Sequence, residues 1–413
     1  MILKNVSLLA VVFISTSFGA SLSGCASVSA QAKTKNSEYE EAKGRYLAAG
    51  WPFESNLFGA EINPFSLDED KPIARVPNVL ERKPRVPFTG PDLQKALLWV
   101  KESEKAIEAN LVDIRSRIAD KTKGPSGADF PGRAQERAMV KVLMLRAEIM
   151  AAAGLPDKAL DDLNAAAEIA HWQLVDFEDS IGYMVGSASF SIFAGELQKF
   201  SPGMLNPKQI AALAAKLDST ADLKSLLKES AAYSLDLVRF EEAESGKVKY
   251  PPDLDKLPAE LVTEQGQKDS IVMMNIWMKI SKILDKHGKE TRLIREEIAP
   301  ILAEMNQLKL KDSSALTDHI KQVESMCEVQ MKVKASTRVF HAAALLATLP
   351  KGSSLDALPK QDWSDPFTGN PLLVKWIDDK VTVTSVGPNG QDDSAQSGKT
   401  DDIRYTLARN QAK

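Results

Sequence analysis

Apolar residues recur every three to four positions through most of the middle of the chain, which is the period of an amphipathic helix. The stripe is clearest in Pro91–Asp120, Arg133–Gly154 and Pro156–Leu174. Proline in the first turn suits a helix start, and Gly154 suits the position just after a helix end. We predict further helices at residues 38–48, 178–199, 206–217, 220–246, 264–287, 290–309 and 313–349.

The two segments on either side of Gly154 form a predicted helical hairpin. Small residues at Gly154, Ala159 and Ala166 lie where a tetratricopeptide repeat packs its two helices closely, so the hairpin resembles one such unit. Arrays of this kind need about three repeats to bury their faces, and the chain offers one clear copy. We therefore predict a helical hairpin, with a helical-repeat peptide-binding scaffold as an alternative function.

The pattern changes after the last long helix, where apolar and polar residues alternate. Leu372–Ile377 and Lys380–Ser385 predict two strands joined by a tight turn. An acidic, glycine-rich loop then runs to Asp402. These patterns predict a mainly α fold, built as helical hairpins in a bundle or a solenoid-like array, with a small C-terminal β-hairpin and acidic loop.

Composition agrees with a globular, helical chain. The 413 residues are 44% hydrophobic and 26% charged, which is ordinary for a folded protein. Alanine, leucine, lysine and glutamate dominate the middle of the chain, which favours helix. The net charge of −4 gives no sign of the basic patch that nucleic-acid binding requires, so we expect no nucleic-acid partner.

The chain begins with MILKNVSLLAVVFISTSFGASLSGCAS. A positive residue, Lys4, precedes the apolar stretch Leu8–Ile14, and this order predicts a secretory signal. The tetrapeptide LSGC, which ends at Cys25, resembles a bacterial lipobox. That resemblance implies cleavage before Cys25 and covalent attachment of a diacylglycerol group and an N-acyl lipid chain, such as palmitate, to this cysteine.

The lipobox resemblance also implies a location in the cell. Several acyl chains anchor a protein firmly, whereas one chain alone is marginal. Ala26 follows the cysteine, where an aspartate would favour retention in the inner membrane. The resemblance therefore implies an outer membrane lipoprotein that faces the periplasm, with the membrane as its partner through the lipid anchor. The alternative is an ordinary signal with a chance cysteine.

These features divide the chain into predicted parts. Residues 1–24 form the signal peptide, 25–37 the lipidated tether, 38–90 a proline-rich wrapping segment, 91–310 the helical domain, and 311–413 the long helix with the hairpin and acidic loop. The wrapping segment carries Trp51, Phe53, Phe58 and Phe65, and we expect these aromatic side chains to hold it against the folded domain.

The C-terminal part carries three short motifs in order. They are an Asp-Pro-aromatic turn with glycine and proline, a Ser-hydrophobic-Gly loop, and an Asp-Ile pair at the end of the acidic loop. The residues are Asp365, Pro366, Phe367, Gly369, Pro371, Ser385, Val386, Gly387, Asn389, Gly390, Asp402 and Ile403. Together they resemble the C-terminal part of the major pseudopilin of type II secretion systems, over roughly the last fifth of the chain.

The pseudopilin resemblance implies a calcium-binding loop. Its ligands would be the backbone carbonyl of Val386, the side chain of Asn389, and Asp392, Asp393, Asp401 or Asp402. Calcium takes about 6–8 oxygen ligands, and close carboxylates repel one another without a cation. Glycines at Gly387, Gly390 and Gly398 let the backbone turn its carbonyls inward. The alternative is a solvated acidic loop without bound metal.

Two departures from the pseudopilin pattern limit what the resemblance implies. Asn389 stands where the family has an aspartate, which lowers the charge of the ligand set. A lipobox stands where the family has its methylated transmembrane helix. We therefore expect a folded module with an ion, and no assembly into a pseudopilus.

No convincing catalytic motif accompanies these features. The GKT sequence at 398–400 looks like the end of a phosphate-binding P-loop, but Asp393 occupies the position of the required earlier glycine. The histidines are scattered and form no HExxH motif; they are His171, His287, His319 and His341. Cys327 falls on the apolar face of a predicted helix, which indicates a small buried hydrophobic residue.

We therefore predict a non-catalytic structural or interaction module of the cell envelope, with an envelope protein as partner and calcium rigidifying the acidic loop. Two alternatives stay open. One is an envelope hydrolase with an unrecognised carboxylate site, which would need carboxyl groups that converge in a cleft with raised pKa values. The other is the helical-repeat peptide-binding scaffold.

Overall fold

The computed structural model describes residues 37–52, 88–119, 130–175, 180–200, 207–217, 222–241, 264–288, 290–307, 313–393 and 401–409. The predicted signal peptide and the lipidation site at Cys25 lie outside the described residues, as do Phe53, Phe58, Phe65 and Gly398. None of the described helices combines the length and the apolar character that crossing a membrane requires.

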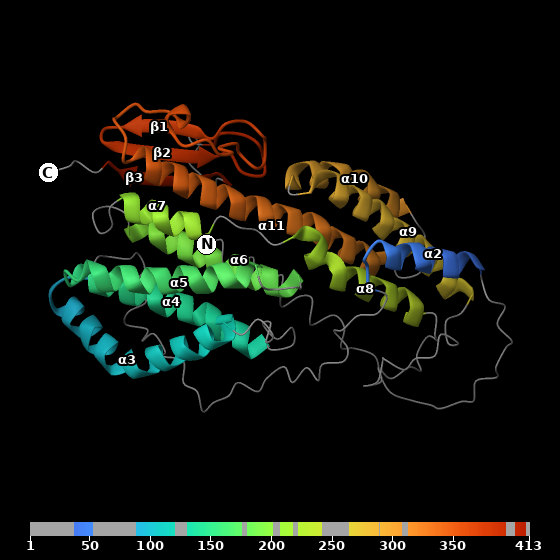
Figure 1. Cartoon of the computed structure of the whole chain (residues 1–413), viewed down its shortest axis with the longest axis horizontal. Coiled ribbons are helices and arrows are strands. Elements are labelled where there is room, and N and C mark those ends of the chain that lie inside the picture. Colours follow the sequence, from blue (N-terminus) through green and yellow to red (C-terminus); the bar gives the residue numbers. More distant parts are fainter. Residues whose placement is uncertain are drawn as a thin grey trace. The chain divides into compact units, whose positions relative to one another are not determined.

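The described part of the chain is mainly helical, with one small C-terminal sheet (Figure 1). The helices are α2 (Ser37–Ala48), α3 (Gly90–Ala119), α4 (Phe130–Ala152), α5 (Pro156–Val175), α6 (Ser180–Phe200), α7 (Pro207–Lys216), α8 (Leu223–Glu241), α9 (Glu264–His287), α10 (Thr291–Gln307) and α11 (Ser313–Leu346). A short 3-10 helix, η5, covers Leu355–Ala357. The predicted fold class is confirmed, and the predicted helices differ from these by only a few residues at their ends.

The sheet has three antiparallel strands in the order β1-β2-β3. The strands are β1 (Leu373–Ile377), β2 (Lys380–Ser385) and β3 (Ile403–Ala408). The first two form the predicted hairpin, with Ile377 paired to Lys380 across the turn. The third strand was not predicted, because the acidic loop was expected to close at Asp402 without further pairing.

The chain divides into two compact units, and helices α8, α10 and α11 each begin in one unit and end in the other. The first unit takes its residues from Met1–Glu61, Leu227–Lys286 and Pro300–Lys321. The second takes the remaining segments, Ile62–Leu226, His287–Ala299 and Gln322–Lys413. It therefore includes α3 to α7 and the sheet.

Aromatic side chains form the core of the first unit. Trp51 lies just after α2 and stacks on Tyr46, with ring centroids 6.4 Å apart. Its other neighbour is Trp277 of α9, at 5.2 Å. The Trp277 indole N–H donates to the Ser234 hydroxyl of α8 at 2.8 Å, which satisfies this buried donor. Trp51 is therefore part of the core of this unit, and the methionine-rich helix α9 fills core.

Helices α4 and α5 form the hairpin that the sequence predicts. The Leu155 N–H bonds to the Met150 carbonyl at 2.9 Å and the Gly154 N–H to the Ala151 carbonyl at 3.0 Å. With Gly154 at a φ of 77°, these two bonds make a Schellman C-terminus. Helix α6 packs on both members of the hairpin (Figure 1), so the unit is a layered bundle of antiparallel helices.

One face of the sheet is buried within the second unit. Val381 and Val383 are fully buried, and Tyr405 and Leu407 of β3 are buried on the same face. Tyr405 meets Phe340 of α11 edge to face, with centroids 4.6 Å apart. Its hydroxyl donates to the Leu197 carbonyl of α6 at 3.2 Å. The sheet and the loops at its ends are therefore tied to two long helices.

Candidate metal centre

The acidic loop connects two neighbouring strands, so its two ends lie side by side. Ser385, the last residue of β2, pairs with Ile403, the first residue of β3. The residues just after Ser385 are consequently held against those just before Ile403. This pairing positions Asp401 and Asp402 beside the glycine-rich beginning of the loop, although they follow it by more than ten positions in the sequence.

Two features fix the beginning of the loop. Gly387 and Gly390 both have a φ of 69°, which is the left-handed region that favours glycine. The carboxylate of Asp365 is buried and accepts the Phe367 N–H at 2.8 Å and the Val386 N–H at 2.7 Å. Asp365 therefore joins the Asp-Pro-Phe turn to the start of the acidic loop.

Gly387 lies against the other end of the loop. A Cβ atom at this position would lie 2.4 Å from the carbonyl oxygen of Asp401 and 3.2 Å from its carboxyl carbon. A side chain of any size would push these groups apart. The absence of a Cβ at Gly387 thus permits the approach that gathers the acidic residues.

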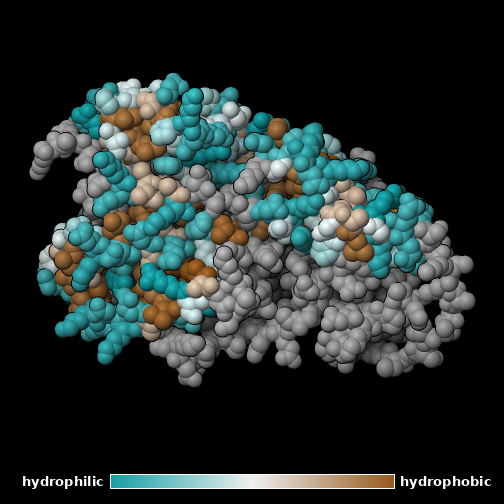
Figure 2. Space-filling view, viewed as in Figure 1, coloured by the Kyte–Doolittle hydropathy of each residue, from teal (hydrophilic) through white to brown (hydrophobic). Residues whose placement is uncertain are grey.

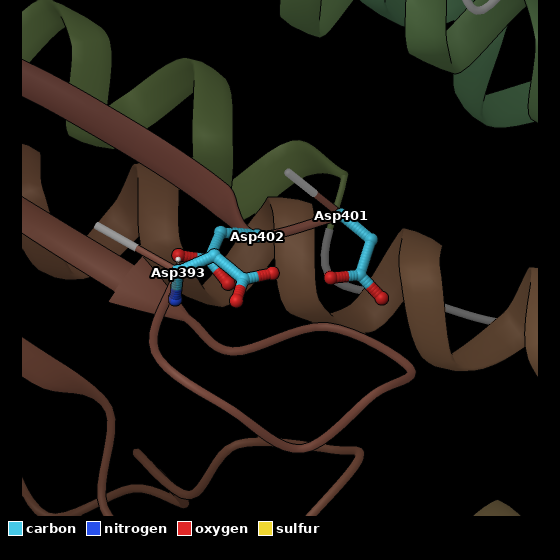
Figure 3. A group of neighbouring side chains, drawn as sticks. All are labelled: Asp393, Asp401 and Asp402. Carbon is cyan, nitrogen blue, oxygen red and sulfur yellow. Dashed lines mark hydrogen bonds between the residues drawn. The ribbon is translucent and has the colours of Figure 1, made fainter. Parts of the chain in front are cut away.

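Three carboxylates converge at this point (Figure 3). Asp393, Asp401 and Asp402 each contribute an oxygen that lies within 4.8 Å of the other two. Asp393 is buried, Asp402 is half-buried and Asp401 is exposed. This is the one group of at least three potential metal ligands from histidine, cysteine or acidic residues found among the described residues.

Hydrogen bonds organise the cluster from within. Asn389 donates its backbone N–H to Asp401 at 3.0 Å and its side-chain amide to Asp393 at 2.8 Å. The Asp393 N–H donates to Asp402 at 3.1 Å. Arg404, on β3, forms an ion pair with Asp402. The three carboxylates and this guanidinium together carry two net negative charges, which a divalent cation would balance.

The structure brings together four of the residues proposed as ligands from the sequence: Asn389, Asp393, Asp401 and Asp402. Asp392 is exposed and is not a member of the carboxylate group. Val386 donates its N–H to Asp365. Sequence reasoning missed the ion pair of Arg404 with Asp402, two positions away. It also missed the bond from Val386 to Asp365, which depends on how the strands pair.

Two other buried carboxylates lie in the helical bundle, each with its own arginine. Asp162 accepts hydrogen bonds from Arg146 at 2.5 to 2.9 Å. Glu136 accepts one from Arg117 at 2.6 Å and one from Gln173 at 2.8 Å. Burial raises the pKa of Asp162, against the opposing effect of the Arg146 charge.

These two carboxylates do not form a catalytic pair. Glu136 and Arg146 are ten positions apart on α4, which is roughly 15 Å along a helix. Asp162 and Gln173, which bond to Arg146 and Glu136, are likewise eleven positions apart on α5, so the two carboxylates lie at different levels of the hairpin. The two carboxyl groups of a glycosidase lie about 5–9.5 Å apart, so the two buried ion pairs stabilise helix packing instead.

The cysteine and the described histidines are buried, hydrogen-bonded or packed against other side chains. Cys327 is fully buried, as predicted, and burial raises the pKa of its thiol to about 12, so the thiol stays protonated near neutral pH. His287 bonds to Glu297 at 2.8 Å. His341 packs against Trp363, with ring centroids 5.5 Å apart, and His171 is half-buried. The side chain of His319 lies outside the described residues.

Comparison with known proteins adds no relative. No protein-family model matches the chain, and neither a curated protein nor a solved structure matches it. The lipobox and pseudopilin resemblances therefore stay predictions based on the sequence motifs.

Proposed function

We propose that this protein is a lipid-anchored, non-catalytic module of the cell envelope whose C-terminal acidic loop binds one calcium ion. The observation that carries the ion site is the convergence of Asp393, Asp401 and Asp402 within 4.8 Å. Carboxylate charges at such separations repel one another, and a hard divalent cation relieves that repulsion while using carboxylate oxygens as ligands.

Calcium suits the surroundings better than a transition metal. The group contains only carboxylates, and no described histidine or cysteine belongs to it. The amide nitrogen of Asn389 donates to Asp393 at 2.8 Å. Oxygen-only ligand sets favour calcium, magnesium and manganese. Calcium accepts the irregular geometry of carboxylate ligands from a loop, whereas magnesium requires a nearly octahedral site.

The anchor and the envelope location rest on the sequence around Cys25, where LSGC follows a short apolar stretch. An anchored protein with an ion-stabilised terminal module fits a role as a structural or interaction partner of another envelope protein. The alternatives, an envelope hydrolase and a helical-repeat peptide-binding scaffold, gain no specific observation from the described residues.

Calcium titration of the purified full chain, by calorimetry with thermal melts alongside, tests the ion site. Extracellular calcium modules have dissociation constants on the order of 0.1–1 mM. Binding in this range predicts that 10 mM calcium stabilises the folded chain by about 1.4–2.7 kcal/mol. We expect saturable heat and a rise in Tm, with both lost in the double variant Asp401→Asn/Asp402→Asn.

The matched control is Asp378→Asn/Asp379→Asn in the β1–β2 turn, which removes the same charge from the same small sheet. Asparagine also tolerates the φ of 52° at Asp378. We expect this control to bind calcium like the unmodified chain. Absence of heat and of any Tm shift at millimolar calcium would show that the acidic loop is only solvated.

A further inference from the structure

The face of the sheet opposite the buried one is open along its first strand. Leu373 and Ile377 of β1 are 40% and 53% exposed, and Lys375 between them is also exposed. Strands alternate their side chains between two faces, so these three lie on one face. Figure 2 shows brown, apolar colour among polar atoms over the sheet, at the upper left of the view.

Strand β1 also forms an edge of the sheet, since among the described strands it pairs with β2 alone. Its register with β2 is continuous from Leu373 to Ile377, without a bulge. Edge strands are commonly protected against pairing by charged side chains such as lysine, by prolines or by bulges. Along β1 the one such feature is Lys375, whose charge opposes a like-charged strand and favours an acidic one. A regular edge of this kind presents backbone groups to which another extended chain can pair.

The charge on the open face indicates what kind of chain would pair there. The register aligns Leu373, Thr384 and Arg404 in one row, Lys375, Thr382 and Thr406 in the next, and Ile377, Lys380 and Ala408 in the third. None of these positions carries a carboxylate. Lys375 and Lys380 are exposed cations, whereas Arg404 is paired with Asp402. An incoming strand therefore meets a cationic position at Lys375, flanked by two aliphatic ones.

Two other occupants fit this edge less well. A second copy of the chain, paired antiparallel about the centre of β1, would place Lys375 directly opposite Lys375, and like charges in that position are destabilising. An anionic lipid surface would meet the acidic turn residues Asp378 and Asp379 beside Ile377. A single acidic side chain on an extended peptide would meet Lys375 without approaching that turn.

We propose that β1 is a docking strand, to which an extended segment of a partner protein adds as a fourth antiparallel strand. An acidic residue of the partner lies opposite Lys375, and apolar residues lie opposite Leu373 and Ile377. Main-chain hydrogen bonds supply affinity, and the alternating side chains supply specificity. This proposal is independent of calcium in the acidic loop.

Fluorescence anisotropy with the purified full chain and two synthetic peptides tests the docking strand. The first probe is labelled Ser-Thr-Val-Val-Glu-Val-Val-Thr-Ser, and the second has lysine in place of the central glutamate. We expect the glutamate peptide to bind and the lysine peptide to bind about fivefold more weakly, as cross-strand charge pairs allow. Lys375→Glu should reverse this preference, so that the lysine peptide binds better.

The control variant is Lys360→Glu, which makes the same change in net charge at an exposed position outside the sheet. It should keep the preference of the unmodified chain. Equal binding of both peptides, or a preference that Lys375→Glu leaves unchanged, would overturn the proposal.

Two further measurements separate the other occupants. If neither peptide binds and a Lys375→Thr chain dimerises in sedimentation, then Lys375 only prevents self-association. If neither peptide binds but vesicles of phosphatidylcholine with 30% phosphatidylglycerol retain the chain through Lys375, the face docks on lipid. Either result would overturn the proposal that a partner strand docks on β1.

Discussion

Two glycines in the acidic loop share a backbone conformation but differ in their surroundings. Gly387 and Gly390 both have a φ of 69°. At Gly387 a Cβ would meet the Asp401 backbone at 2.4 Å, whereas at Gly390 the nearest atom is the Thr368 methyl group at 3.7 Å. The pair thus separates the cost of a left-handed backbone from the cost of separating the two ends of the loop.

We predict that Gly390→Ala lowers the free energy of unfolding by about 1 kcal/mol, the cost of a left-handed conformation for alanine. Gly387→Ala should cost about 2–4 kcal/mol, because overpacking against the backbone adds to the same conformational term. It should also abolish calcium heat, since Asp401 can no longer approach. Denaturant unfolding and calorimetry check both. Equal costs for the two variants would show that the close approach is unimportant.

At the level of single residues, the sequence predicted the part of the site that depends on local motifs. Gly387, Asn389 and the aspartates belong to one recognisable loop pattern, so their grouping was expected. The hydrogen bond that Asp365 accepts from the Val386 N–H was not expected. It joins distant segments and depends on how the strands pair, and a short motif does not contain that information.

At the level of elements, one close crossing of helices determines how α5 and α6 pack. Gly186 of α6 lies so near α5 that a Cβ would be 2.2 Å from the carbonyl oxygen of Gln173. Gly195 lies on the same helix, nine positions further on, and a Cβ there would meet nothing within 4 Å. Small residues at a crossing let two backbones approach, and elsewhere in a helix glycine is only a conformational cost.

These two glycines should respond to alanine with opposite signs. Gly186→Ala should destabilise the chain by about 2 kcal/mol or more, because the helices must move apart or the backbone must distort. Gly195→Ala should stabilise it by roughly 0.5–1 kcal/mol, since alanine is the better helix former. Thermal and denaturant unfolding give both values. Stabilisation by both substitutions would contradict the close α5–α6 crossing.

Helices were easier to predict than the sheet for a physical reason. Apolar periodicity and end residues such as Gly154 are local, so they set the helix bounds within a few positions. Strand β3 lies beyond the acidic loop, and its alternation of Ile403, Tyr405 and Leu407 is short. Its pairing with β2 depends on a contact between distant segments, which local pattern reasoning did not supply.

At the scale of the whole molecule, the proposed function joins features from opposite ends of the chain. The lipid anchor rests on Cys25, and the ion site and docking strand belong to the C-terminal sheet. That sheet is held by Phe340 of α11 and the Leu197 carbonyl of α6, so its loops have a firm support within their unit. Anchoring and ion binding can therefore be tested separately, since each depends on its own residues.

The last prediction concerns the anchor. In a host cell with an outer membrane, the chain should fractionate with membranes and incorporate labelled palmitate, because several acyl chains give stable attachment. Cys25→Ala should move it to the soluble periplasmic fraction and remove the label. Cys327→Ala, which deletes the other cysteine, should leave both unchanged, because that thiol is buried and protonated. If the Cys25→Ala chain still fractionates with membranes, the lipobox prediction is wrong.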